Sequence, residues 1–257
     1  MRHPPVTLGP RVPLVAVAHG SRDPRAAATV AELAAAVRAL RPDVPVHAAF
    51  LDHAAPAPDR VLAGLAADGA GTAVVAPLLL TAAYHSKTDI PGVLARARRA
   101  HPRLAVRTAA TLGPDALLVA ALERRLAEAG VAAGDPDTAV VLVAAGSSDP
   151  AANACVRDVA RAWRARGWRD AVPAFASAVT PRPAAAVAAL RAAGARRVAV
   201  ASYFLAPGHF ADKVRAESLA AGADAVSPVL GAAPELAELV LTRYTEALGV
   251  PASAQAG

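Results

Sequence analysis

Hydrophobic residues along the chain form short continuous runs that alternate with longer stretches rich in alanine and leucine. Apolar runs of about four to eight residues are typical of strands buried on both faces, and the longer periodic stretches are typical of helices. Their alternation predicts a parallel β–α–β architecture. The segment 130–137 (Gly-Val-Ala-Ala-Gly-Asp-Pro-Asp) is rich in helix breakers and predicts a linker between two halves.

Each half is expected to contain one four-stranded parallel sheet flanked by helices. The predicted strands of the first half are Leu14–Ala18, Val46–Leu51, Thr72–Leu80 and Leu104–Thr108, and its predicted helices are Pro24–Leu40, Pro58–Asp68, Ile90–Ala100 and Pro114–Ala129. The predicted strands of the second half are Ala139–Ala144, Val172–Ala176, Arg197–Leu205 and Asp224–Val226, and its predicted helices are Pro150–Arg166, Pro183–Ala193, Ala211–Ala221 and Pro234–Leu248.

The same motif occurs once in each half. Residues 15–24 read Val-Ala-Val-Ala-His-Gly-Ser-Arg-Asp-Pro, and residues 141–150 read Val-Leu-Val-Ala-Ala-Gly-Ser-Ser-Asp-Pro. In both copies an aspartate followed by proline predicts a helix start, because the carboxylate caps the helix and proline has its φ preset. The fold class is therefore α/β, with two tandem-duplicated, doubly wound domains over residues 1–132 and 138–250. His19 of the first copy aligns with Ala145 of the second, so at this position only one copy has a side chain that can bind a metal.

Composition narrows the class of protein. The chain has 257 residues and is 55% hydrophobic, which is enough for two packed cores. Cys155 is the only cysteine and lies in a predicted helix, so no disulfide framework or cysteine cluster is expected. The first residues contain no apolar leader, and the longest apolar run is too short to cross a bilayer. A protein of the reducing cytoplasm, without membrane association, is expected.

The net charge of +6 is only weak support for nucleic-acid binding and is compatible with an acidic small-molecule substrate. Only two of the 27 basic residues are lysines, the arginines are scattered along predicted helices, and only 4% of residues are aromatic, so stacking on bases is not expected. No glycine-rich dinucleotide or Walker A loop follows any strand, and the nucleophile elbow of α/β-hydrolases is absent.

Two histidines follow neighbouring strands of the first half. His19 comes directly after the first strand and His85 follows the third. With a 2-1-3-4 strand order, the crevice at the carboxyl ends lies between these two strands, so both imidazoles are expected to face it. Neutral imidazoles with open coordination positions suit Fe²⁺, Co²⁺ or Ni²⁺. Tyr84-His85 aligns with Gly208-His209, so the second half keeps one imidazole and the site is predicted in the first half.

Other residues at the same predicted edge have two interpretations. The amides of Gly20 and Ser21 suit a carboxylate, although turn formation alone also accounts for them. Arg22 and Lys87 are candidates for pairing with substrate carboxylates, with solvated surface charge as the alternative. His209 is a weaker candidate for substrate contact from the second half.

The remaining candidates have weaker support. Asp89 is either an outer neighbour of the metal or, preferably, the cap of the helix that starts at Ile90. Asp52 and His53 follow the second strand and are expected only at the rim of the site. The other histidines, which are predicted to be surface residues away from this edge, are His3, His47 and His101.

Together these motifs resemble the sirohydrochlorin chelatases, the class II tetrapyrrole chelatases that insert Fe²⁺ or Co²⁺ into sirohydrochlorin. The resemblance rests on His-Gly-Ser-Arg-Asp-Pro after the first strand, on Ala-Phe-Leu at 49–51, and on Pro-Leu-Leu-Leu with the later His85 and Asp-Ile-Pro at 89–91. It covers nearly the whole chain, because the long members of the family are tandem duplications.

The resemblance implies a metal chelatase, a lyase of sirohaem or cobalamin biosynthesis, that holds a tetrapyrrole between two similar domains. His19 and His85 match the catalytic, metal-binding histidines, and Ala145 implies one active site per chain. No cofactor beyond the substrate metal is expected. The lack of histidine-rich or cysteine-rich extensions favours iron over cobalt, and a monomer is expected because the two halves mimic a dimer. Insertion of metal into another porphyrin and non-catalytic carriage of metal or tetrapyrrole stay open as alternatives.

Overall fold

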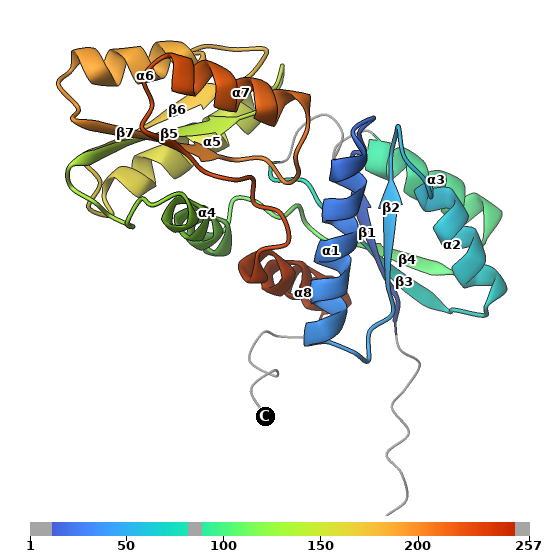
Figure 1. Cartoon of the computed structure of the whole chain (residues 1–257). Coiled ribbons are helices and arrows are strands. Elements are labelled where there is room, and N and C mark those ends of the chain that lie inside the picture. Colours follow the sequence, from blue (N-terminus) through green and yellow to red (C-terminus); the bar gives the residue numbers. More distant parts are fainter. Residues whose placement is uncertain (1–11, 82–88, 250–257) are drawn as a thin grey trace, which may run out of the picture.

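The computed structural model describes residues 12–81 and 89–249, which form two parallel four-stranded sheets with helices on both faces (Figure 1). The first half contains β1 (Leu14–Ala18), α1 (Pro24–Leu40), β2 (Val46–Phe50), α2 (Pro58–Ala67), β3 (Thr72–Pro77), α3 (Ile90–Ala100), β4 (Ala105–Thr108) and α4 (Ala116–Glu128). The second half contains β5 (Thr138–Ala144), α5 (Pro150–Arg164), β6 (Asp170–Phe175), α6 (Pro183–Ala192), β7 (Arg197–Ser202), α7 (His209–Ala220), β8 (Ala225–Val226) and α8 (Pro234–Leu248).

The strand orders are β2-β1-β3-β4 and β6-β5-β7-β8, with parallel pairing throughout. The predicted fold class and the 2-1-3-4 order are confirmed. The central strands β1 and β3 are neighbours, so the residues that follow them leave the sheet at one shared edge, which we call the carboxyl edge.

Capping chemistry fixes the starts of the two helices that follow the duplicated motif. The Asp23 side chain accepts a hydrogen bond from the Arg25 amide at 3.0 Å, and Asp149 accepts one from the Ala151 amide at 2.9 Å. In each helix a proline follows the cap, where no amide hydrogen bond is lost. These helix starts are confirmed.

Several boundaries differ from the prediction, by up to three residues. β3 ends at Pro77 rather than Leu80, because the carbonyl of Leu79 pairs with the amide of Leu112 in a loop beyond the sheet. α4 begins at Ala116 rather than Pro114, because Asp115 is its cap and accepts from the Leu117 amide at 2.9 Å. α7 begins two residues early, at His209.

Alternate residues of the central strands face two different cores. Leu14 and Ala16 of β1 belong to a large core that both halves share, whereas Val15 and Val17 pack against α2 and α3. The same alternation in β5 divides its side chains between the shared core and a core under α6 and α7. Each sheet thus has one outer face of its own and one inner face in common with its partner.

The last helix of each half packs across the boundary between the halves. α8 contacts α1 and β3 of the first half, α4 contacts β7 of the second half, and α4 and α8 contact each other. Figure 1 shows these two helices between the sheets. None of the helices among residues 12–81 and 89–249 is both long and apolar enough to cross a membrane.

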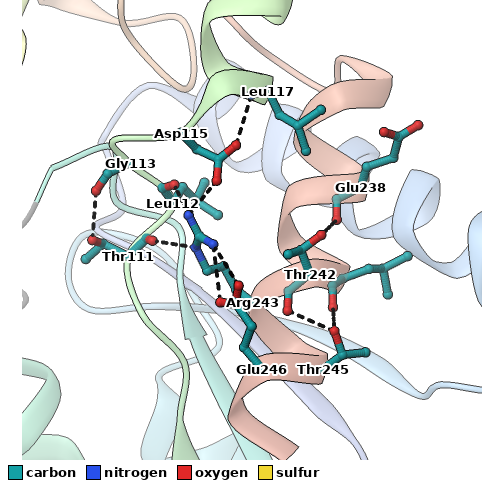
Figure 2. A network of polar contacts seen from close by, with 11 residues as sticks. Thr111, Leu112, Gly113, Asp115, Leu117, Glu238, Thr242, Arg243, Thr245 and Glu246 are labelled. Atoms are coloured by element: carbon teal, nitrogen blue, oxygen red, sulfur yellow. Dashed lines mark hydrogen bonds and ion pairs between the residues drawn. The ribbon is translucent and has the colours of Figure 1, made fainter. Parts of the chain in front are cut away.

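Arg243 links α8 to the loop after β4 in the first half (Figure 2). Arg243 of α8 donates hydrogen bonds to the carbonyls of Thr111 and Leu112 at 3.0 and 3.1 Å. It also donates to the Asp115 carboxylate at 2.8 Å, the same side chain that caps α4. One guanidinium therefore holds both crossing helices to the loop after β4.

Candidate functional site

His19 is exposed at the carboxyl edge, immediately after the buried strand β1. Its carbonyl accepts a hydrogen bond from the Asp52 amide at 2.9 Å, which joins the loop after β1 to the loop after β2. Gly20 has a φ of 96°, and a Cβ there would lie 1.8 Å from the Asp52 carbonyl oxygen. Only glycine fits where the two loops approach so closely.

Ser21 is a turn residue in this structure. Its hydroxyl oxygen accepts the Asp23 amide at 3.1 Å, and Ser147 accepts the Asp149 amide at 3.0 Å in the second half. Because the same hydrogen bond forms in both halves, the serine hydroxyl stabilises the turn independently of any role at the site. The backbone geometry at Gly146 is also repeated, with a φ of 84° and a Cβ position 2.2 Å from the Ser177 carbonyl oxygen.

A second imidazole lies beside His19. The ring centroids of His19 and His53 are 6.5 Å apart, with an interplanar angle of 80°. Asp52 directly precedes His53 and contacts it. The Asp52 Oδ1 atom lies 3.4 Å from Nδ1 of His53 and 2.7 Å from the backbone amide nitrogen of His53. Both residues are predicted only at the rim of the site, and the ring of His53 lies beside that of His19 at the carboxyl edge.

A cavity of about 350 Å³ opens at this edge. One wall is formed by His19 and the loop after β2, with Leu51 and Asp52, and the facing wall by the first turns of α3, with Asp89, Val93 and Arg96. The lining contains two acidic side chains, Asp52 and Asp89, and the basic side chain of Arg96. Arg96 also forms an ion pair with Asp59 at 3.1 Å. The cavity offers an imidazole, carboxylates and a cation in one place.

The expected capping role of Asp89 is wrong. Asp89 precedes α3, but its side chain makes no capping hydrogen bond. Its φ of −73° and ψ of −45° are helical, whereas a capping residue needs an extended backbone to reach back to the first amides. The side chain lines the cavity instead.

The second half approaches the same edge from the loop after β7. His209 is exposed at the first position of α7, and a Cβ on the preceding Gly208 would lie 3.9 Å from Ser21 Oγ. Arg25 of α1 forms ion pairs with its neighbour Asp23 at 2.6 Å and with Asp212 of α7 at 2.5 Å. These two carboxylates raise the pKa of Arg25 above its already high value. Sequence reasoning missed this contact, because nothing local pairs two residues so distant in the chain.

The other predicted site residues fall into two groups. Arg22 is exposed at the start of the turn before α1. His85 and Lys87 lie outside the residues that the structure describes. Within the described ranges, no three histidine, cysteine, aspartate or glutamate side chains are grouped so that they can hold a metal ion.

His47 and His101 lie away from the candidate site, and both are partly buried rather than fully exposed. His47 is half-buried in β2 because this strand is covered by helices. Burial lowers its pKa below the value near 6.5 of an exposed histidine, and the nearby Arg38 lowers it further. Cys155 in α5 is partly buried, and burial raises the pKa of its thiol, as expected for a packed cysteine.

The lowered pKa of His47 predicts a loss of stability in mild acid. The unfolded chain protonates His47 more readily than the folded one, so its contribution to stability is complete above about pH 6.5 and is lost as the pH falls further. We expect His47→Gln to lose less unfolding free energy than the original chain between about pH 7.5 and about pH 5. Urea unfolding at both pH values measures this. Identical losses in the two proteins would contradict the prediction.

A match to a family model identifies the family of the chain. The CbiX family model matches the chain twice, over residues 13–129 and 139–247, so each half of the chain contains one match. The chain belongs to the CbiX family. The prediction of a duplicated chelatase-like protein is confirmed by this double match.

Named relatives of this CbiX protein are chelatases. It is 28% identical over 177 residues to a sirohydrochlorin ferrochelatase of Priestia megaterium, which covers 68% of this chain and 66% of the relative. It is 29% identical over 199 residues to a sirohydrochlorin cobaltochelatase of the same organism, which covers 75% of this chain and 63% of the relative. The matched region spans just under two thirds of the length of both relatives.

Solved structures share the fold of this CbiX protein. SirB from Bacillus subtilis with Fe³⁺ superposes with a TM-score of 0.79 at 24% identity, covering 92% of this chain and 95% of that one. SirB from Bacillus subtilis subspecies spizizenii in complex with cobalt gives a TM-score of 0.77 at 22% identity, with coverages of 95% and 98%. These likenesses extend over both halves, including the two sheets.

Proposed function

We propose that this CbiX protein inserts a divalent metal, Fe²⁺ or Co²⁺, into sirohydrochlorin. The observation that carries the proposal is the exposed imidazole of His19 beside a cavity at the carboxyl edge of the first sheet, where the second half has Ala145. Membership of the CbiX family and the relatives named as ferrochelatase and cobaltochelatase support it.

The proposed metal-binding and catalytic residues are His19 and His85. His19 follows β1, and the sequence places His85 after β3, the strand that pairs with β1. Two neutral imidazoles hold a first-row metal while leaving coordination positions open. Pyrrole nitrogens can then displace the remaining ligands one at a time. The second half, with Ala145 in place of His19, does not hold the metal.

The proposed substrate contacts surround the same edge. Sirohydrochlorin is a polycarboxylate, and Arg22 and Lys87 are the cations that pair with its carboxylates. The amides of Gly20 and Ser21 bind a further carboxylate, and His209 reaches the substrate from the start of α7 in the second half. The approach of Gly208 to Ser21 supports this arrangement, because it brings the two halves together at the site.

The chemistry requires removal of two protons as the metal enters. The metal ion replaces the two pyrrole hydrogens of the macrocycle, and these leave as protons. An imidazole gains and loses a proton near neutral pH, so one of the site histidines accepts the first of them. No nucleotide or redox cofactor takes part. The protein acts in the cytoplasm as a monomer, because both halves of the site come from one chain.

Anaerobic turnover of sirohydrochlorin with Fe²⁺, Co²⁺ and Ni²⁺ in parallel tests this function. We expect many turnovers per chain with iron or cobalt, followed by the absorbance change of the macrocycle, and preference for sirohydrochlorin over coproporphyrin in the same mixture. Binding of one equivalent of substrate or metal without turnover would overturn the proposal in favour of a carrier. Preference for coproporphyrin would overturn the choice of substrate.

A further inference from the structure

An arginine in the first turn of α1 connects the two halves of the chain. The Arg25 guanidinium donates from Nε and Nη2 to the carboxylate of its neighbour Asp23, at 3.1 and 2.6 Å. Nη2 also donates to the Asp212 carboxylate at 2.5 Å, and Asp212 lies in the first turn of α7. These bonds fix the direction of the guanidinium, although 54% of the Arg25 side chain is exposed to solvent.

The Arg25–Asp212 pair lies where the two halves approach each other at the carboxyl edge. A Cβ on Gly208, the residue before α7, would lie 3.9 Å from the hydroxyl oxygen of Ser21 in the turn before α1. The Asp212 amide donates to the Gly208 carbonyl at 3.0 Å, so Asp212 is one helical turn away from this approach. A ligand that bridges the two halves at this edge therefore comes close to both charged side chains.

The turn before α1 does not require a cation at position 25. The second half has Ala151 at the equivalent position, and the Ala151 amide still donates to the capping carboxylate of Asp149 at 2.9 Å. A positive charge near a helix N-terminus is unfavourable, because the free amides there already carry partial positive charge. The cation occurs only in the half that carries His19, so its role belongs to the site rather than to the turn.

We propose that Arg25 binds a carboxylate of sirohydrochlorin and that Asp212 occupies this binding position until the substrate displaces it; the inference rests on the proposed function. The Asp212 carboxylate shows where the guanidinium accepts a second acid group beside Asp23. A substrate carboxylate can form the same charge-assisted hydrogen bond. The Asp212 side chain is 56% exposed, and an ion pair between exposed groups is weak enough for a ligand to replace it.

The charges of this cluster determine the direction of the effect. Arg25 and Asp23 alone neutralise each other, whereas Asp212 gives the cluster a net negative charge. Asp212 therefore opposes a polycarboxylate in two ways, because it occupies the guanidinium and repels further acid groups. Asp23 stays in place when Asp212 leaves, because its side chain is the less exposed of the two and also caps α1.

Binding of metal-free sirohydrochlorin to the full chain, followed by the absorbance of the macrocycle, tests this exchange. We expect Arg25→Ala to weaken binding at least about 5-fold, because a charge-assisted hydrogen bond to the substrate is lost. We expect Asp212→Asn to strengthen binding about 2- to 5-fold, because the competing carboxylate is removed. A pair that only ties the two halves together predicts changes in the same direction, because each variant breaks the same contact.

The chain offers controls for folding and for net charge. Ala151 shows that alanine is compatible with the turn and the cap at the position equivalent to Arg25. Glu217 lies further along α7, where it pairs with Lys213 at 3.7 Å and both side chains are exposed. Glu217→Gln removes the same charge from the same helix as Asp212→Asn, and it should change the affinity much less. An equal gain in these two variants would show a general effect of net charge and would overturn the exchange.

The outcomes also separate this inference from the proposed function. Affinity changes of the same sign in Arg25→Ala and Asp212→Asn, unchanged affinity in either, or no binding by the original chain would overturn the exchange. Opposite changes, with Glu217→Gln close to the original chain, support it. Insertion of Fe²⁺ or Co²⁺ is measured in parallel. Opposite binding changes in a chain that never turns over refute only the chelatase function, and turnover with unaltered binding in the variants refutes only the exchange.

Discussion

Substitution of His19 by alanine is expected to lower the rate of metal insertion into sirohydrochlorin by about 100-fold or more. The imidazole is the exposed metal ligand proposed at the end of β1, and loss of a ligand or proton acceptor has effects of this size. The measurement is the initial rate of insertion of Fe²⁺ or Co²⁺ under anaerobic conditions.

The fold of the His19→Ala variant should be unaffected. Ala145 occupies the same place after β5, and the adjoining glycine turn forms there with similar dihedral angles. Unfolding in urea should therefore match that of the original chain. The control His101→Ala changes a histidine away from the carboxyl edge and should keep the original rate. A His19→Ala protein with wild-type insertion rates would disprove the assignment of this residue.

Substitution of Arg243 by methionine is expected to lower the unfolding free energy by about 2–4 kcal/mol. The Arg243 side chain is only 12% exposed, and its guanidinium binds two backbone carbonyls and the Asp115 carboxylate (Figure 2). Methionine keeps the apolar stem and removes the donors, which leaves these partly buried acceptors without their partner. The cost is large because the same carboxylate also caps α4.

An exposed arginine provides the matched control for Arg243. Arg161 pairs with Asp158 on the surface of α5, and both side chains are mostly exposed. Arg161→Met should change the unfolding free energy by less than about 0.5 kcal/mol, because exposed ion pairs contribute little. Urea unfolding of the three proteins tests both values. Equal stability of the two variants would show that the link between α8 and the loop after β4 does not stabilise the fold.

Local sequence signals predicted most of the secondary structure. The boundaries of β1, α1, α3 and α8 coincide with the prediction, because short apolar runs, proline after a capping aspartate and periodic helical stretches act over a few residues. The boundaries that differ depend on partners elsewhere. β3 stops at Pro77, and the Leu79 carbonyl beyond it accepts a hydrogen bond from the Leu112 amide, a pairing that no local pattern specifies.

The candidate site was partly predictable, because some of its features depend on local sequence. A strand-end histidine in a parallel sheet is visible in the sequence, and the repeat identified His19 against Ala145. The closeness of His53 to His19 was not visible, because the distance between the two rings depends on a positive φ at His53 and on the pairing of two loops. The Asp212–Arg25 ion pair depends on how the two halves pack.

The sequence by itself determined the two-fold repeat, the alternation of strands and helices and the half that carries His19, because these follow from periodicity, short-range turn chemistry and side-chain identity. Only the tertiary structure decided that α4 and α8 cross to the opposite half and that the two inner sheet faces share one core. An apolar stripe along a helix shows that this face must be buried, but many different apolar surfaces could cover it equally well. The choice among them depends on the shape of the whole packed chain.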